Sequence, residues 1–526
     1  MGVYRIGIDV GGTHTDAVLL DQYNQVISET KSPTTEDVSV GIYTAMRKII
    51  DEAKVPREQI KYAMLGTTHC TNAIVERKRL NNIAIIRIGA PATLAVKPLI
   101  GVPDDLRAVL GKYVYLIRGG HEFDGREIVE LDEAHLYQIA EEIKGKVDSI
   151  AITSVFSPVS QTHEQRASEI FKEVLGEETS ISLSSEIGSV GLLERENATI
   201  LNAAVVNVAK TTADGFINAL KNEGIEAKVF FCQNDGTLMS IEYAVKYPIF
   251  TVACGPTNSL RGASYLSELT DAIVLDVGGT TTDIGVLVQS FPRESSLAVE
   301  IGGARTNFRM PDLISIGLGG GTIIRIGEKG EFTIGPDSVG YRLPEKALIF
   351  GGDTLTTTDV AVALGKVELG DASKVAHLEK DLLNRIYLNM VNLVEEAIDK
   401  MKTSAAPVPV ILVGGGSILL PEELKGASEV IRPLHSGVAN AIGSAISQVS
   451  GQIEKVYALA EIGRETALEQ AKELAMSEAI SAGADPQTLV IVDIEDVPLA
   501  YMPGNATRIR VKAAGDLAQA VMNEPV

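Results

Sequence analysis

Cysteine is scarce in this chain. The three cysteines, Cys70, Cys232 and Cys254, are far apart, and none belongs to a Cys-x-x-Cys pair. Zinc ribbons and iron–sulfur clusters need closely spaced cysteines, so both kinds of site are excluded. An odd number of separated cysteines also offers no disulfide framework, and we expect reduced thiols and a cytoplasmic location.

A basic surplus and long apolar runs are also lacking. Lys and Arg number 47 against 69 Asp and Glu, which gives a net charge of −22. We therefore expect no nucleic-acid partner and no anionic membrane surface. The N-terminal residues lack the charged, apolar and small-residue order of a signal peptide, and no apolar run is long enough to span a bilayer.

The composition that is present belongs to a folded chain. Hydrophobic residues make up 45% of the 526 residues and charged residues 22%. This balance is typical of globular proteins, and the length predicts two or three domains.

An eight-residue segment occurs twice, about half the chain apart. Asp9–Asp16 reads Asp-Val-Gly-Gly-Thr-His-Thr-Asp, and Asp276–Asp283 differs from it only by a threonine in place of His14. Strand-like residues flank both copies. Each half of the chain is therefore predicted to contain a β-hairpin with a glycine-rich turn.

Each hairpin has the residue types of a phosphate-binding turn. Glycine allows a ligand to approach the backbone closely, threonine hydroxyls can donate to phosphate oxygens, and the leading aspartate can reach a metal ion or a water. Two such hairpins could face each other across one polyphosphate; the alternative is that the motif serves only to make a turn. The candidate binding residues are Gly11, Gly12, Thr13, Thr15, Gly278, Gly279, Thr280, Thr281 and Thr282.

The segments around the hairpins predict two α/β lobes. Three meandering strands followed by alternating helices and strands are typical of a ribonuclease-H-like lobe. In the first lobe we expect strands at 26–31, 62–65, 83–88 and 150–155, and helices at 38–53, 72–79 and 164–174. The second lobe repeats the meander, with 299–303 as its expected third strand.

The chain is expected to divide into three parts. The first lobe would comprise residues 1–195, the second 196–447, and a small C-terminal α/β appendage 448–526. In the appendage, an alanine- and glutamate-rich helix is expected over 453–482, because Gly483 and Pro486 stop it. Strands are expected at 489–494 and 507–511.

Three further clusters adjoin the repeat. Gly414-Gly415-Gly416 follows an apolar strand pattern, where a flat ring could lie against bare backbone; a tight strand-to-helix turn would look the same. The glycine run 316–322 could contact phosphate or allow close packing. Thr356–Asp359 is expected to cap the helix that follows it, and it could also face a cleft.

These residues resemble the hydantoinase A/5-oxoprolinase-type ATP-binding subunits of the actin-like ATPase superfamily. The resemblance spans about residues 4–445. Besides the two hairpins, its motifs are Gly66–Ala73, Glu76–Lys78, Glu194-Arg195, Leu201–Ala203, Gln233–Gly236, Ala253–Pro256, Ile316–Thr322, Gly335–Ser338 and Thr358-Asp359. Cys254 stands where the family usually has serine, and Gly414–Ser417 lacks the Gly-Pro-x-His continuation of the longer members.

The resemblance implies ATP and Mg²⁺ as cofactors and a lactam- or hydantoin-type cyclic amide as substrate. It implies that phosphorylation of the amide prepares the ring for hydrolysis, commonly with a second subunit of hydantoinase B type or an unrelated catalytic subunit. Asp9 and Asp276 would hold Mg²⁺, and Asp283 or Asp16 would orient a water or the substrate, so the catalytic candidates are Asp9, Asp276 and Asp283. The adenosine would lie on Gly414, Gly415 and Gly416.

Other functions remain open at this point. They are an ATP-dependent carboxylase subunit, a small-molecule kinase, and an ATP-driven reactivase or chaperone. A homo-oligomer is open as well. An activator of a radical dehydratase is disfavoured, because cluster-binding cysteines are absent. His69 and Cys70 are candidate catalytic residues or packing residues, and the loop with His121, Glu122 and Asp124 is a metal or substrate site or a solvated turn.

Overall fold

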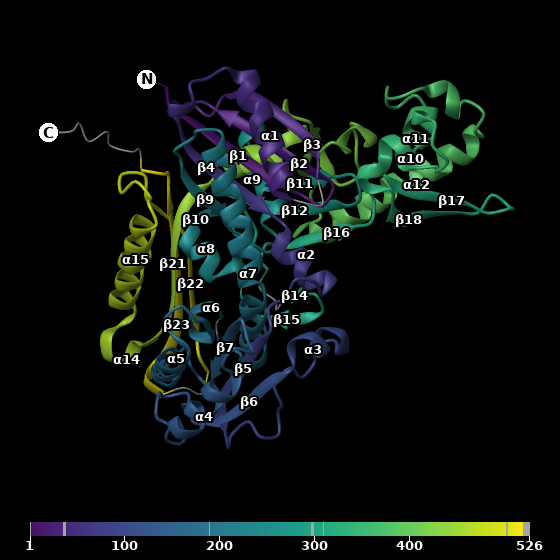
Figure 1. Ribbon diagram of the computed structural model, residues 1–526. Coiled ribbons are helices and arrows are strands. Elements are labelled where there is room, and N and C mark those ends of the chain that lie inside the picture. Colours follow the sequence, from purple (N-terminus) through teal and green to yellow (C-terminus); the bar gives the residue numbers. More distant parts are fainter. Residues whose placement is uncertain are drawn as a thin grey trace.

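The computed structural model describes residues 2–34, 38–188, 190–295, 299–308, 310–500 and 503–518. It is an α/β structure with three larger sheets and two short hairpins. In Figure 1 the four-stranded sheet lies at the lower end of the molecule, and α10–α12 lie at the upper right. The expected hairpins are both present, in two different sheets.

The first sheet has nine strands in the order β22-β23-β21-β10-β9-β4-β1-β2-β3. Its hairpin β1–β2 and strand β3 form the antiparallel meander, and β4 pairs with β1 in parallel. The strands are β1 (Tyr4–Val10), β2 (His14–Leu20), β3 (Val26–Pro33), β4 (Ile60–Thr67), β9 (Lys228–Cys232), β10 (Thr237–Ser240), β21 (Gln448–Ala458), β22 (Val490–Pro498) and β23 (Ala506–Gly515).

The second sheet repeats this beginning. Its path is β13-β12-β11-β19-β20, with β16 also paired to β12. The strands are β11 (Ala272–Val277), β12 (Thr282–Val288), β13 (Phe291–Pro292), β16 (Leu313–Ile316), β19 (Val408–Val413) and β20 (Ala427–Ile431). The expected third strand at 299–303 is wrong: Val299–Ile301 forms β14 but pairs with β15 (Ala304–Thr306) in a separate hairpin. A second separate hairpin joins β17 (Thr322–Ile326) and β18 (Phe332–Ser338).

The third sheet is wholly parallel, with the order β6-β5-β7-β8. Its strands are β5 (Ile83–Ala90), β6 (Tyr113–Arg118), β7 (Ser149–Ser154) and β8 (Ser180–Leu183). Helices α4 and α5 cover it, and its apolar residues form a core cluster with theirs.

The helices follow from apolar spacing. In α1, the residues Ile42, Ala45, Met46, Ile49 and Ile50 are buried on one face, as a 3.6-residue period requires. The longer helices are α1 (Val38–Ala53), α2 (His69–Glu76), α3 (Asp104–Leu110), α4 (Glu133–Ile143), α5 (Thr162–Leu175), α7 (Leu192–Asn222), α9 (Cys254–Ser267), α11 (Thr357–Ala363), α12 (Lys380–Met401), α13 (Ala439–Ile446) and α15 (Arg464–Ser481). The shorter ones are α6 (Ser184–Ile187), α8 (Ile241–Lys246), α10 (Leu343–Lys346) and α14 (Leu459–Ile462).

Residues 448–515 form strands and helices, as expected, but the helix expected over 453–482 begins too early. Residues 453–458 belong to β21, and α15 starts at Arg464. Strands β21–β23 extend the first sheet beyond β10, and they run beside α15 at the left of Figure 1. Sheet membership therefore does not follow chain order, and the domain limits after residues 195 and 447 stay predictions.

Glycines allow two helices to pack closely between the sheets. A Cβ atom on Gly262 of α9 would lie 1.8 Å from the carbonyl oxygen of Ala439, and one on Gly443 of α13 would lie 1.8 Å from that of Asn258. A Cβ on Gly7 of β1 would similarly meet Ala441 of α13 at 2.3 Å. Because these positions have no side chain, α9 and α13 come close enough to carry polar residues to the ends of both hairpins.

Candidate functional site

The two copies of the repeated segment form hairpins with the same register. Asp9 pairs with Asp16 across β1 and β2, and Asp276 pairs with Asp283 across β11 and β12. In the two turns, the N–H of Gly11 donates to His14 at 2.9 Å, and the N–H of Gly278 donates to Thr281 at 2.8 Å. The two halves of the chain thus present equivalent turns.

A cavity of about 770 Å³ lies between these turns. The turns approach each other closely, since a Cβ on Gly279 would lie 3.4 Å from Cγ2 of Thr13. Of the residues expected to bind ligand, those that line the cavity are Gly11, Gly12, Thr13, Asp276, Gly278, Gly279, Thr280, Thr281, Gly414, Gly415 and Gly416. A volume of several hundred cubic ångströms is typical of small-molecule sites.

Thr15 and Thr282 are turned away from this cavity. The hydroxyl of Thr282 donates to the carbonyl of Leu318 at 2.6 Å, and that of Thr15 lies 3.4 Å from the hydroxyl of Thr34. Both side chains are fully buried. These contacts support the hairpins, and direct binding of a ligand by the two hydroxyls stays a prediction.

Of the leading aspartates, Asp9 is buried and Asp276 is half-buried at the cavity wall, and both accept hydrogen bonds from α9 or α13. The side-chain amides of Asn258 and Asn440 each donate to Asp9 at 3.0 Å, and Asn440 also donates to Asp16 at 2.8 Å. The hydroxyl of Ser259 donates to Asp276 at 2.5 Å. Both carboxylates are therefore fixed in position before any ligand binds.

Burial changes the acidity of these carboxyl groups. It raises the pKa of Asp9 to about 6, with a further contribution from the nearby charges of Asp16 and Asp276. Burial also raises the pKa of Asp276, and it raises the pKa of Asp283 to about 6. A nearby cation would offset both burial and repulsion. Because magnesium prefers oxygen ligands, this set of carboxylates fits a magnesium ion.

Lys31 and Asn440 belong to this site, although neither was identified from the sequence as a candidate site residue. Nζ of Lys31 forms an ion pair with both oxygens of Asp16, at 2.9 and 2.8 Å, and donates to the carbonyl of Gly437 at 3.2 Å. Lys31 and Asn440 both line the cavity. The expected meander contained a signal for Lys31, since β3 places it directly opposite Asp16. Asn440 lies in no recognisable motif.

The glycine turn after β19 lies against the second hairpin. A Cβ on Gly414 would meet Oδ1 of Asp276 at 2.3 Å, and the N–H of Gly416 donates to Val277 at 2.8 Å. Ile418 and Leu419 continue the cavity wall beside the bare backbone. This wall combines peptide planes with apolar side chains, which suits a flat heterocycle.

The glycine run 316–322 packs behind the second turn, as one of the two alternatives expected, and contact with phosphate stays a prediction. A Cβ on Gly319 would lie 2.7 Å from the nitrogen of Thr280, and Gly320 and Gly321 donate to the carbonyls of Gly278 and Gly279. Thr356 and Asp359 form the expected capping box at the start of α11. Thr358 and Gly320 also line the cavity.

His69 and Cys70 lie outside this cavity lining. His69 is buried against the hydroxyl of Thr67, and burial lowers its pKa to about 4. Cys70 is buried as well, and the same effect raises its pKa to about 11. A neutral thiol and a weakly basic imidazole, both outside the cavity lining, favour packing roles for the two residues.

Two solved structures share this architecture. A caprolactamase from Pseudomonas jessenii, described as ATP-dependent, superposes with a TM-score of 0.79 at 19% identity, covering 99% of this chain and 89% of its own. Acetone carboxylase in a nucleotide-free structure gives 0.71 at 18% identity, covering 98% and 88%. The chain thus has the two-lobed actin-like α/β fold, as expected.

The chain belongs to the hydantoinase/oxoprolinase family. The family's N-terminal region model matches residues 5–175, and its hydantoinase/oxoprolinase model matches residues 195–385. This confirms the resemblance seen in the sequence. None of the helices in the described ranges combines the length and hydrophobicity needed to cross a bilayer.

Curated relatives include both amide hydrolases and carboxylases. An uncharacterised protein of Methanocaldococcus jannaschii is 27% identical over 76% of this chain. The caprolactamase subunit alpha of P. jessenii is 25% identical over 69%, and the acetone carboxylase beta subunit of Xanthobacter autotrophicus is 25% identical over 71%. The matches span 62%, 54% and 56% of these relatives, respectively.

Proposed function

We propose that this chain is the ATP-binding subunit of an enzyme that activates a lactam- or hydantoin-type cyclic amide by phosphorylation and so prepares the ring for hydrolysis. The observation that carries the proposal is the cavity enclosed by two equivalent hairpins and the glycine turn after β19. It accords with relatives named as a caprolactamase subunit and a 5-oxoprolinase.

In this proposal each part of the cavity takes one part of the nucleotide. The backbone N–H groups and hydroxyls of the turns at residues 11–13 and 278–281 bind phosphate oxygens. Asp9 and Asp276 hold Mg²⁺ directly or through water, and Gly414–Gly416 lie against the adenosine. Magnesium supplies charge neutralisation for the terminal phosphate.

Phosphorylation addresses the poor reactivity of an amide. The amide oxygen attacks the terminal phosphorus, the bond to the bridging oxygen breaks, and ADP leaves. Water then adds to the activated carbon, and the ring C–N bond breaks to leave a free amine and an acyl phosphate. A second water cleaves the acyl phosphate to the carboxylate and inorganic phosphate. We assign the orientation of substrate or water to Asp283 or Asp16. Asp16 lines the cavity, whereas Asp283 lies outside its lining, and burial raises the pKa of Asp283 to about 6. A carboxyl group with a pKa near neutrality can exchange a proton.

We assign the hydrolytic step to a partner subunit of hydantoinase B type or to another catalytic subunit. The basis is that several relatives are themselves named as subunits. A phosphorylated amide reacts with bulk water, so productive ring opening requires a shielded and oriented water. The chain alone is therefore expected to hydrolyse ATP slowly and to open few rings.

The test uses the purified chain with ATP, Mg²⁺ and a panel of lactams and hydantoins, with and without the co-purified partner. Phosphate release and ring-opened product should rise together when the partner is added. Asp276→Asn is the matched inactive control. ATP turnover that no cyclic amide stimulates, with or without the partner, would contradict the proposal.

A carboxylase is the second candidate, because relatives include acetone and acetophenone carboxylase subunits. It predicts ATP-dependent incorporation of labelled bicarbonate into a ketone. A stable phosphorylated product would instead indicate a small-molecule kinase, and stimulation only by a large protein partner would indicate a reactivase. The domain limits, cytoplasmic location and any homo-oligomer belong to the same set of proposals.

A further inference from the structure

The parallel sheet β6-β5-β7-β8 has a second polar site at the carboxyl ends of its strands. The chain leaves β5 toward β6, which lies on one side of β5. It leaves β7, which lies on the other side of β5, toward β8, in the opposite direction across the sheet. The connections therefore diverge between β5 and β7. In open parallel sheets, ligands bind outside the carboxyl ends of the strands at such a point.

The Gly119-Gly120-His121 turn after β6 lies at this point. The N–H of His121 donates to the carbonyl of Val155, just after β7, at 3.1 Å. A Cβ on Gly119 would lie 2.6 Å from Ile88 of β5 and 3.2 Å from Nδ1 of His163. The absence of side chains at the two glycines brings the turn down onto both strand ends.

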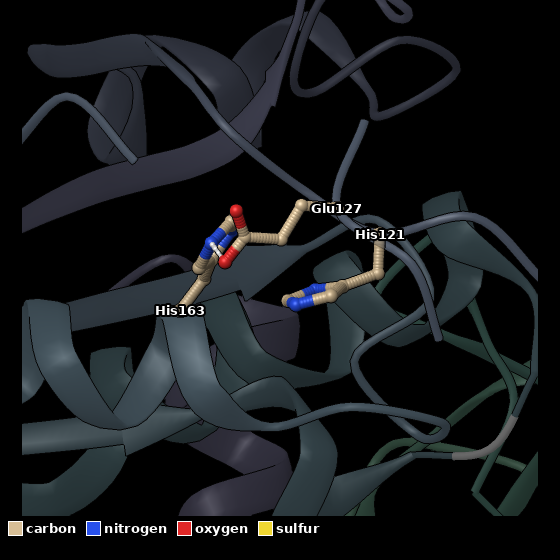
Figure 2. A group of neighbouring side chains, drawn as sticks. All are labelled: His121, Glu127 and His163. Atoms are coloured by element: carbon tan, nitrogen blue, oxygen red, sulfur yellow. Dashed lines mark hydrogen bonds and ion pairs between the residues drawn. The ribbon is translucent and has the colours of Figure 1, made fainter. Parts of the chain in front are cut away.

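Three side chains converge there. His121 and Glu127 are paired across an antiparallel bridge, and His163 lies in the first turn of α5. One ligating atom from each lies within 4.8 Å of the other two, and the imidazole centroids are 4.3 Å apart. Figure 2 shows the Glu127 carboxylate beside the ring of His163, with the ring of His121 next to them.

The hydrogen bonds of His121 leave one nitrogen unused. Nε2 lies 3.1 Å from the hydroxyls of both Ser160 and Thr162, so it can donate its proton to either. Nδ1 then carries a lone pair, and this atom is buried without a hydrogen-bond partner. Only 1% of the residue is exposed. An imidazole whose other nitrogen is held by a hydrogen bond is the usual arrangement of a metal ligand.

We infer that His121, Glu127 and His163 bind a transition-metal ion of the Zn²⁺ type. Two imidazoles and one glutamate form a zinc ligand set that leaves a fourth position for water or an oxygen ligand. The nitrogen donors disfavour Mg²⁺ and Ca²⁺, which prefer oxygen ligands. The Glu127 side chain is 55% exposed, so the ion would be reachable from solvent.

One existing contact must change when the metal binds. Nδ1 of His163 accepts from the N–H of Gly120 at 2.9 Å, and Nε2 lies 3.2 Å from Oε1 of Glu127. The ring proton therefore lies on Nε2, facing the carboxylate. A metal ion on Nε2 replaces this proton, and the Gly120 contact has to open as Nδ1 becomes protonated. One hydrogen bond, from His163 to Glu127, thus already joins two of the three side chains.

The test is direct metal binding by the tag-free full chain after treatment with a chelator. Dialysis against Zn²⁺ followed by elemental analysis is expected to give one tightly held equivalent per chain. Dialysis against Co²⁺ is expected to give the visible absorption bands of a tetrahedral or five-coordinate ion with nitrogen ligands. Neither readout depends on nucleotide turnover or on the proposed function.

Variants assign the ligands. Glu127→Gln changes an exposed side chain and is expected to weaken zinc binding about tenfold or more, measured by competition with a chromophoric chelator. His121→Asn and His163→Gln should abolish the cobalt bands. Glu122→Gln in the same loop, His135→Gln on α4, and Asp276→Asn in the nucleotide cavity are the controls and should bind as the unchanged chain does.

Two results would overturn the assignment. One is that the unchanged chain loses its zinc to the chelator, or that it retains no more zinc than the His121→Asn/His163→Gln double variant. The comparison requires that the double variant has the melting temperature of the unchanged chain. The other is that Glu127→Gln binds as tightly as the unchanged chain. Circular dichroism of each variant separates loss of a ligand from loss of the fold.

Discussion

Asn258 donates its side-chain amide to Asp9 at 3.0 Å, and the next residue on α9, Ser259, donates to Asp276 at 2.5 Å. Two neighbouring helix positions thus hold the leading aspartates of both hairpins. Because α9 contacts strands of both sheets, a displacement of this helix would move both carboxylates together.

Asp276→Asn is expected to reduce ATP turnover by about a thousandfold or more, because the amide supplies no negative charge for Mg²⁺. The melting temperature should stay within a few degrees, since Ser259 can still donate to the remaining oxygen. Phosphate release measures the expected loss of turnover, and thermal unfolding measures the expected retention of stability. Asp214→Asn, an exposed aspartate on α7, is the control, and turnover by Asp276→Asn equal to that of the control would refute the assignment.

Asp9→Asn is expected to abolish turnover and yet stabilise the fold at pH 7. The pKa of Asp9 is raised from 3.8 to about 6, so the folded chain binds this proton more tightly than the unfolded chain. Stability from this group therefore falls as pH rises from about 4 to 6 and stays lower above that, by about 3 kcal/mol. Asn258 Oδ1 has no partner and can accept from the new amide if the Asn258 side chain turns.

Denaturant unfolding of both proteins across pH checks this expectation. Asp9→Asn should be more stable by about 1–3 kcal/mol at pH 7, with the difference disappearing near pH 4. A difference that is constant with pH would show that burial of the Asp9 charge is not its cause.

Lys31→Met is expected to lower kcat about tenfold or more and to raise KM for ATP. The ammonium group pairs with Asp16, which is 2% exposed, and lines the cavity. Its loss removes a positive charge from the cavity, and within the described residues it leaves the buried Asp16 carboxylate with the hydrogen bond from Asn440. Steady-state kinetics measure the effect, with Lys48→Met on the exposed face of α1 as the control. Unchanged kinetics would assign Lys31 to fold stability alone.

Two glycine substitutions separate support of the turn from contact with the ligand. Gly319→Ala would place a Cβ 2.7 Å from the nitrogen of Thr280, so it should displace the second turn and lower both stability and nucleotide affinity. A Cβ at Gly12 would meet no atom of the chain within 4 Å, although Gly12 lines the cavity. Gly12→Ala should therefore leave the melting temperature unchanged and weaken only nucleotide binding, as isothermal titration can measure. Full nucleotide affinity in Gly12→Ala would show that the ligand does not approach this turn.

The repeated segment was sufficient to predict the two lobes, because local glycine and aspartate chemistry specifies both hairpins. Side chains brought in from α9 and α13 were not predictable in this way. Asn258, Ser259 and Asn440 reach the carboxylates only because Gly7, Gly262 and Gly443 allow close helix packing. That packing depends on contacts between segments far apart in the chain, which periodicity within one segment does not reveal.

The sequence predictions that were wrong also failed because of contacts between distant segments. The composition of residues 453–458 predicts the start of the following helix, but these residues pair with β23 and form a strand. Tertiary context therefore overrides local propensity here. Val299–Ile301 has strand-forming residues, yet the glycines at 302 and 303 turn it back onto β15. His163 was not linked with His121, because the two residues meet only through the order of the parallel strands.

The order of the first sheet also bears on how the chain is made. Strand β10 pairs with β21, which begins at residue 448, so this pairing cannot form until that part of the chain has been synthesised. Strand β23 lies between β21 and β22, although it is the last of the three in the sequence. During synthesis at about 5–20 residues per second, β10 therefore remains an open sheet edge while the entire second hairpin region is being translated. A nascent chain of this protein is expected to need protection from edge-to-edge association on the ribosome until its last strands emerge.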